Sequence, residues 1–220
     1  MASVGGRRAA IAGATGLVGK AILDGLLRDG DVAEVHALGR RPPTVRHAKL
    51  TAHVVDFTAV PALPALDEVY LALGTTIKVA GSQAAFRAVD FDANLAVGRA
   101  ALAAGARRCG LVSAMGANSK SLVFYSRVKG ELEEALASLA FDGLVMARPS
   151  LLVGERSGLG QPERPGERIG QVIGRLLGPL VPGNYRPVSA DDVARALLAR
   201  VPTAAGRVVV PSGEISSGRG

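Results

Sequence analysis

The sequence is poor in cysteine and in aromatic residues. Cys109 is the only cysteine, tryptophan is absent, and aromatic residues make up 4% of the chain. A single cysteine excludes an internal disulfide framework and a cysteine-ligated metal cluster, and it fits a reducing compartment. The histidines His36, His47 and His53 lack helical i, i+4 spacing and a carboxylate motif, so we predict no metal.

Long apolar runs are also missing. No uninterrupted run approaches the ~18 residues of a membrane span, so no membrane partner is expected. Arg7 and Arg8 precede an apolar stretch, but several glycines and then Lys20 and Asp24 interrupt it, which argues against a secretory or twin-arginine signal. These features together predict a soluble cytoplasmic protein.

Concentrated positive charge is lacking as well, although the net charge is +7 and the sequence pI is about 10.2. The arginines are scattered singly or in pairs, and no run reaches the roughly five like charges of a nucleic-acid-binding tail. Aromatic side chains for stacking on bases are sparse. The sequence therefore predicts no nucleic-acid partner and favours a small-molecule substrate.

What the chain does contain is a regular alternation of short β-rich apolar runs and longer helical patterns. This alternation is typical of βαβ units around a parallel sheet, and 220 residues suffice for one core. We therefore expect one α/β domain over residues 1–220 with a doubly wound parallel sheet. Strands are predicted at 9–12, 34–38, 50–55, 68–73, 108–113, 144–148 and 207–210.

Helical periodicity predicts helices over 17–28, 83–104 and 125–139. In the last of these, Leu132 and Leu136 fall on the buried stripe, and Glu131, Glu133 and Glu134 are expected to face water.

The carboxyl-terminal part of the chain has three predicted features. Ser189 and Asp192 form a capping-box pattern that starts a further helix. Gly, Pro and charged residues dominate much of 151–187, so this segment is expected to be a small substrate loop or cap, with a helical pattern over 169–180. The Gly- and Ser-rich tail after Pro211 is expected to be frayed.

A glycine pattern stands at the first strand–helix junction, in Gly13-Ala14-Thr15-Gly16-Leu17-Val18-Gly19. A dinucleotide pyrophosphate binds at such a helix N-terminus, where free N–H groups and the helix dipole favour an anion and small residues allow close approach. A simple tight turn would also use glycine, but the position favours a Rossmann-like cofactor site. The predicted cofactor contacts are Gly13, Thr15, Gly16, Leu17, Val18 and Gly19.

The residues after the second predicted strand indicate which dinucleotide binds. Proteins that prefer NAD usually carry an acidic residue there to accept bonds from the ribose 2′-hydroxyl. Here Gly39 is followed by Arg40 and Arg41, whose guanidiniums could grip a 2′-phosphate. An arginine pair that merely faces solvent is the alternative, and we predict NADP (NADPH).

Three further residues form a candidate catalytic set. Tyr125 and Lys129 are four residues apart in a helical segment, so they share one face. A nearby ammonium favours the phenolate and lets the phenol exchange a proton with a substrate oxygen. Ser113 ends the fifth predicted strand, where it could hydrogen-bond a substrate carbonyl. A Tyr–Lys pair on a surface helix is the plain alternative.

With these motifs in order, the chain resembles the short-chain dehydrogenase/reductase superfamily. Within it, the chain is similar to atypical NAD(P)-binding members, the NmrA-like proteins and the Tat-interacting-protein type of oxidoreductase. The resemblance implies that Lys129 also reaches the nicotinamide ribose. It implies further cofactor contacts at Asp56, Phe57, Leu73, Gly74, Thr75 and Pro149. Asp90 stands where the family has a helix asparagine, and Ala114 takes the second place of a frequent serine pair.

The reaction predicted from these residues is hydride transfer between nicotinamide and a small carbonyl or alcohol, with Tyr125 handling the proton. Two alternatives stay open. The first is a redox sensor or regulatory protein that binds NADP without turnover, and the second is an epimerase or dehydratase acting on a nucleotide sugar. The protein is expected to be a monomer or a homodimer.

Overall fold

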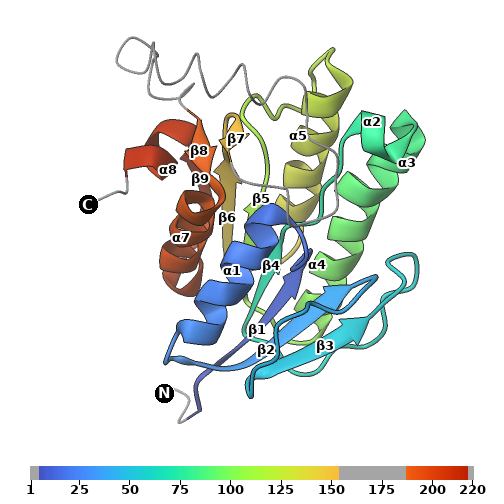
Figure 1. Ribbon diagram of the computed structural model, residues 1–220. Coiled ribbons are helices and arrows are strands. Elements are labelled where there is room, and N and C mark those ends of the chain that lie inside the picture. Colours follow the sequence, from blue (N-terminus) through green and yellow to red (C-terminus); the bar gives the residue numbers. More distant parts are fainter. Residues whose placement is uncertain (1–4, 154–186, 218–220) are drawn as a thin grey trace.

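The described residues form one parallel sheet. The computed structural model describes residues 5–153 and 187–217, shown as a coloured ribbon in Figure 1. Within this part of the chain, seven strands pair in the order β3-β2-β1-β4-β5-β6-β9, and each neighbouring pair is parallel. The strands are β1 (Arg7–Ala12), β2 (Val32–Gly39), β3 (Leu50–Val54), β4 (Glu68–Leu71), β5 (Arg108–Val112), β6 (Gly143–Arg148) and β9 (Gly206–Pro211).

The doubly wound α/β fold predicted from the sequence is confirmed. All four residues of β4 are buried, as expected for a strand covered on both faces. The strand order reverses at β1, which pairs with β2 on one side and β4 on the other. In open α/β sheets, ligands bind beyond the carboxyl ends of the strands at such a reversal.

Helices cover both faces of the sheet (Figure 1). On one face, α1 (Leu17–Arg28) and α7 (Ala190–Arg200) bury Ile22, Leu26 and Leu197 in a shared core. On the other face, α4 (Asn94–Ala103) and α5 (Phe124–Ala137) bury Val97, Leu132 and Leu136 in a second core. The Ser189 hydroxyl caps α7 by accepting the Asp192 N–H at 3.1 Å, as its capping pattern predicts.

The helix predicted over 83–104 is present but changes its winding. It consists of α3 (Gln83–Arg87), a π-helical segment η1 (Ala88–Ala93) and α4. π-helical turns are rare and are frequently found at functional sites. Smaller elements are α2 (Ile77–Ala80), η4 (Val201–Thr203), and a parallel pair formed by β7 (Leu152–Val153) and β8 (Val188–Ser189).

Two predictions for the carboxyl-terminal part have different outcomes. The described part of the tail after Pro211 is not frayed, because it forms α8 (Ser212–Ser217), which buries Ile215 and joins the Ser212 hydroxyl to the Ser150 hydroxyl at 2.9 Å. The predicted substrate cap over 151–187 and its helical pattern lie almost wholly outside the described residues. In the described part of the chain, no helix is long and apolar enough to cross a membrane.

Cys109 offers a test of the core. It lies on β5 with no exposed surface, and burial raises the pKa of its thiol. Because the thiolate is the reactive form, we expect Cys109 in the native protein to resist a thiol reagent and to react at the rate of global unfolding. Labelling followed by mass spectrometry measures this rate. An Ala52→Cys control in a Cys109→Ala background, on the exposed side of β3, should react at once, and equal rates for the two thiols would contradict the fold.

Candidate functional site

The turn between β1 and α1 is packed so closely that it admits no side chains at two glycines. Gly13 has a φ of +92°, and a Cβ there would lie 2.5 Å from the Ala72 carbonyl oxygen. A Cβ on Gly19 would lie 2.0 Å from the Gly13 carbonyl oxygen. Only glycine fits both positions, so the start of α1 is pressed against the loops at the carboxyl edge of the sheet.

The N-terminus of α1 is suited to an anion. Its N-cap is Gly16, which supplies no capping side chain, and the first turn contains no acidic residue. The first N–H groups of a helix lack partners within the helix, and the helix dipole adds a partial positive charge at this end. A cradle of glycines and backbone amides at the strand-order reversal fits the diphosphate of a dinucleotide. Among the other predicted contacts in this turn, Thr15 is exposed and Val18 is buried.

The loop after β4 lies beside this turn and is held by one side chain from η1 and one from the start of α4. The Asp90 carboxylate accepts the Thr75 N–H at 2.8 Å, and the Asn94 amide donates to the Leu73 carbonyl oxygen at 3.0 Å. A Cβ on Gly74 would lie 3.6 Å from the same Asp90 carboxylate. The structure therefore brings the predicted cofactor loop, Leu73 to Thr75, to the cofactor edge and fixes its backbone.

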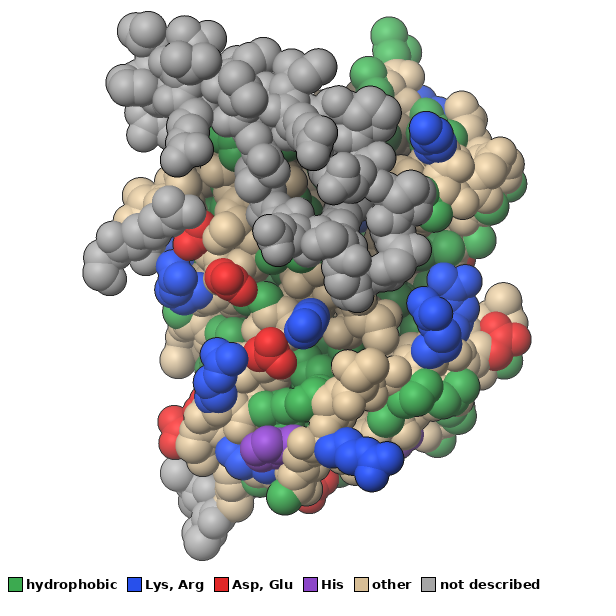
Figure 2. Space-filling model, in the orientation of Figure 1, with side chains coloured by type: hydrophobic (Ala, Val, Ile, Leu, Met, Phe, Trp, Pro, Cys, Tyr) green, Lys and Arg blue, Asp and Glu red, His purple; other side chains and the backbone are tan. Residues whose placement is uncertain are grey.

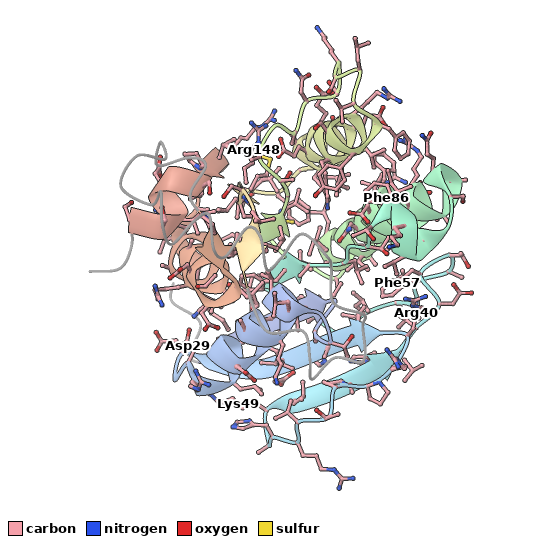
Figure 3. All side chains as sticks on the ribbon, turned by 45° about the horizontal axis from the view of Figure 1, so that its top comes forward. Asp29, Arg40, Lys49, Phe57, Phe86 and Arg148 are labelled. Carbon is pink, nitrogen blue, oxygen red and sulfur yellow. The ribbon has the colours of Figure 1, made fainter. Side chains whose placement is uncertain are left out.

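The loops after β2 and β3 carry the residues predicted to meet the adenosine half. Figure 3 labels Arg40 in the first loop and Phe57 in the second. Arg40 and Arg41 are exposed, and neither forms an ion pair with any residue of the described chain. Asp56 is exposed and its pKa is lowered by hydrogen bonds from Thr58, while Phe57 packs against the second core. Both guanidiniums are thus available to an anionic ligand.

Tyr125 and Lys129 lie one turn apart on α5, but their surroundings differ. Tyr125 is 38% exposed, and its ring lies 5.6 Å from the buried Phe86 ring, measured between centroids. The Lys129 ammonium lies 2.7 Å from an Asp90 carboxylate oxygen, and these two side chains are only 6% and 1% exposed. The phenol is accessible, whereas the ammonium is held in a buried ion pair.

Ser113 is buried, and its hydroxyl has a partner other than the one we expected. It donates to the Glu133 carboxylate at 2.6 Å. Arg148, labelled in Figure 3 beside α5, donates to both oxygens of the same carboxylate, which raises the pKa of Arg148. Because its proton is committed to Glu133, Ser113 does not present a donor to a carbonyl in this arrangement. The prediction that Glu133 faces water is wrong, since its side chain is 1% exposed.

Sequence reasoning missed Glu133 as part of the site, and it assigned no role to Arg148 or Asn94. Glu133 follows Lys129 by four residues, so helical spacing places it on the same face as Lys129, and that spacing could have indicated its burial. Asp90 drew notice only as a departure from the family pattern, and its ion pair with Lys129 was not foreseen. Pro149 lies where expected, after β6, and its carbonyl oxygen accepts the Met115 N–H at 2.9 Å.

The fold and the glycine cradle together define a Rossmann-type dinucleotide-binding protein. Residues 13–153 match the family model described as NAD(P)H-binding, and the chain belongs to this family. The NAD(P)-binding family and the Rossmann-like fold that the resemblance to the short-chain dehydrogenase/reductase superfamily implied are thereby confirmed. A nicotinamide cofactor is likewise supported, whereas the choice of NADP over NAD stays a prediction.

Known proteins resemble the chain over most of its length. The mitochondrial protein FMP52 of Candida albicans is 33% identical over 86% of this chain and 85% of its own, and that of Emericella nidulans is 35% identical over 77% and 75%. Among solved structures, MoeE5 in complex with UDP-glucose and NAD has a TM-score of 0.69 at 18% identity, covering 96% of this chain and 80% of its own. A short-chain dehydrogenase family protein from Francisella tularensis has a TM-score of 0.65 at 12% identity, covering 96% and 99%.

These relatives correct one expectation. We predicted a cytoplasmic protein from the missing signal and membrane patterns, but the relatives with 33% and 35% identity are named as mitochondrial proteins. The prediction of a cytoplasmic location is therefore wrong. Composition and apolar run length report on membrane spans and do not distinguish one aqueous compartment from another.

The glycine cradle can be tested with one methyl group. Gly19→Ala places a Cβ against the Gly13 carbonyl, so the turn must open and the amides lose their alignment. We expect affinity for NAD(P)H to fall at least about tenfold, measured by calorimetry, because positioned hydrogen bonds to a charged group are lost. Gly30→Ala is the matched control, because nothing lies within 4 Å of its Cβ position. Full cofactor affinity in a folded Gly19→Ala protein would refute the cradle.

Proposed function

We propose that this protein is an NADP-dependent oxidoreductase that transfers a hydride between nicotinamide and a small carbonyl or alcohol substrate. The observation that carries the proposal is the α5 face at the cofactor edge, where an accessible Tyr125 stands one turn before a buried, fixed Lys129. A phenol that is open to ligands and backed by an ordered ammonium is suited to proton transfer at a substrate oxygen.

Different residues of the chain would bind different parts of the cofactor. The amides of residues 13–19 would receive the diphosphate, and the loop from Leu73 to Thr75 and Pro149 would border the cofactor. When bound, the nicotinamide supplies or accepts the hydride. The Lys129 ammonium, held 2.7 Å from the Asp90 carboxylate, would donate to the ribose hydroxyls.

Tyr125 is assigned the proton transfer and Ser113 a supporting role. A substrate carbonyl would have to compete with the Glu133 carboxylate for the Ser113 proton, and hydrogen bonds to charged groups contribute about 1.5–3 kcal/mol. The Tyr125 hydroxyl has no hydrogen-bond partner within the described part of the chain. It can therefore meet a substrate oxygen without breaking a bond there, and Ser113 orients that oxygen only after its hydroxyl turns from Glu133.

A second candidate function is an NADP-binding sensor or regulatory protein without turnover. Two buried carboxylates favour this function, because Asp90 pairs with Lys129 and Glu133 accepts the hydrogen bond from Ser113, so two of the three predicted catalytic groups already have partners. A sensor needs the cradle and a cofactor-dependent surface but has no need of an accessible phenol. The exposure of Tyr125 is the reason that we place the enzyme first.

Cofactor choice is tested at the arginine pair. In the double variant Arg40→Ala/Arg41→Ala, two charge-assisted contacts to a 2′-phosphate are removed. We expect NADPH affinity to fall about 10- to 100-fold while NADH affinity is unchanged, measured by parallel calorimetric titrations. Arg46→Ala, another exposed arginine of the same connection, is the control. Equal losses for both cofactors, or a preference of the parent protein for NADH, would remove NADP from the proposal.

Turnover is tested at the phenol. We expect Tyr125→Phe to bind NADPH normally and to lose about 10²- to 10⁴-fold in kcat on any carbonyl substrate that the parent protein reduces, because a general acid is removed. NADPH absorbance in a carbonyl panel gives the rate, and Ser126→Ala on the same helical turn is the control. Unchanged kcat in Tyr125→Phe would exclude the phenol. A parent protein that binds NADPH and turns over nothing in the panel would favour the sensor.

A further inference from the structure

We propose that Asp90 is a positioning residue that couples Lys129 to the cofactor loop after β4 and offsets the charge that Lys129 exerts on Tyr125. The inference rests on the proposed function for its catalytic meaning, but its structural basis is independent of turnover. One carboxylate connects three parts of the site: the π-helical segment η1, helix α5 and the loop after β4.

The two oxygens of Asp90 serve different partners. Oδ1 lies 2.7 Å from the Lys129 Nζ, and Oδ2 accepts the Thr75 N–H at 2.8 Å. A carboxylate with both oxygens engaged at these distances has little freedom to rotate, and it is 1% exposed. Movement of the Thr75 backbone is therefore transmitted to the Lys129 ammonium, which is expected to contact the cofactor.

The first residue of α4, directly after η1, gives the loop a second support. Asn94 follows it by four residues, and its amide donates to the Asp90 carbonyl oxygen at 3.1 Å and to the Leu73 carbonyl oxygen at 3.0 Å. The Asn94 amide therefore binds a carbonyl oxygen of this loop, and the Asp90 carboxylate binds an N–H group of the same loop. Two side chains of one helical stretch fix both ends of the Leu73–Thr75 turn, so Asp90 is placed by backbone geometry as well as by charge.

The side chains around Tyr125 determine how strongly Asp90 can affect the ionisation of the phenol. Phe86 from α3 and Phe124 from α5 are apolar neighbours, with the Phe86 ring 5.6 Å from the Tyr125 ring and 5.8 Å from the Phe124 ring. The other charged groups on this face are Arg87 and Arg127, which share Glu131, and Arg148, which pairs with Glu133. Each of these arginines is partly exposed to solvent, whereas Lys129 is buried, so the electrostatic field at the phenol depends most on how far Asp90 cancels Lys129.

The Asp90→Asn substitution changes the charge and the hydrogen-bonding groups of this side chain but keeps its shape. It therefore tests the positioning role of Asp90 without disturbing the packing around it. Asparagine has one carbonyl oxygen, so it can keep the Thr75 bond or the Lys129 contact but not both, and it removes the negative charge. The ammonium then acts on Tyr125 unopposed. We expect Tyr125 to ionise about one pH unit lower than in the parent protein, and the acidic limb of a kcat profile to move in the same direction.

Asp92→Asn is the matched control. It makes the same charge change in the same π-helical segment, two residues on, at an exposed position. Solvent screening there should leave the ionisation of Tyr125 within a few tenths of a pH unit. We also expect NADPH affinity to fall a few-fold in Asp90→Asn and to be unchanged in Asp92→Asn, since Asp90 is the one of these two aspartates that binds the cofactor loop.

Tyrosinate absorbance in the near ultraviolet gives the ionisation without any assay of activity. The signal of Tyr125 is the difference between each protein and the same protein with Tyr125→Phe, which removes the contribution of the other two tyrosines. Tyr70 is buried, and burial raises its pKa well above the ordinary value, so it ionises outside the range of interest. The experiment uses the full chain with and without NADPH.

The outcomes separate this inference from the proposed function. A shift in Asp90→Asn but not in Asp92→Asn supports it, even if the parent protein turns over no substrate and the enzyme proposal fails. Equal ionisation and equal NADPH affinity in the two variants would overturn it and leave Asp90 as a structural partner of Lys129.

The Asp90→Asn variant leaves the buried Lys129 ammonium without a carboxylate partner, which can prevent folding, so a second variant is needed. Asp90→Asn/Lys129→Met removes both charges together. If the two charges cancel, Tyr125 in this protein ionises within about half a pH unit of the parent. A rise of a full unit would show that Lys129 acts unopposed in the parent protein, and the inference would fail.

Discussion

The close approach of the β1–α1 turn to the neighbouring backbone is the constraint on which the rest of the site depends. Gly13 lets the turn lie against the backbone of residue 72, and Gly19 lets the first turn of α1 lie against Gly13, with no room for a methyl group at either glycine. This contact aims the uncapped end of α1 at the point where the strand order reverses. The loops after β2, β4, β5 and β6 are arranged around that point because parallel strands end at one edge.

A second constraint lies on α5, where charged side chains enter an otherwise apolar layer. Lys129 and Glu133 are buried one turn apart, and each is satisfied from another element: Lys129 by Asp90 from η1, and Glu133 by Ser113 and Arg148 from the strand ends. Burying such groups is costly unless partners are in place, and removing one partner typically costs about 3–5 kcal/mol. The interactions that position the site are therefore also interactions that hold the helix to the sheet.

The sequence predicted those parts of the molecule that local pattern controls. The strand positions follow from apolar periodicity. Helix α1 follows from its periodicity and from the glycines that precede it, and the capping pattern at Ser189 was sufficient to place α7. The burial of Glu133 was missed because its partner Arg148 is 15 residues away on a strand, and local periodicity counts a glutamate as polar surface. The π-helical turn and α8 were missed for a related reason, since contacts with distant residues decide both.

The same contrast explains why the motif residues of the site have unequal roles. A tyrosine, a lysine and a serine at the expected spacing look equivalent in sequence, but the structure gives carboxylate partners to the lysine and the serine and leaves the phenol accessible. Groups that are already satisfied contribute position and field, while an unsatisfied hydroxyl at a ligand edge can enter chemistry without first breaking a bond. Under the proposed function, the proton step would therefore belong to Tyr125, and the two carboxylates would set the position and charge of its neighbours.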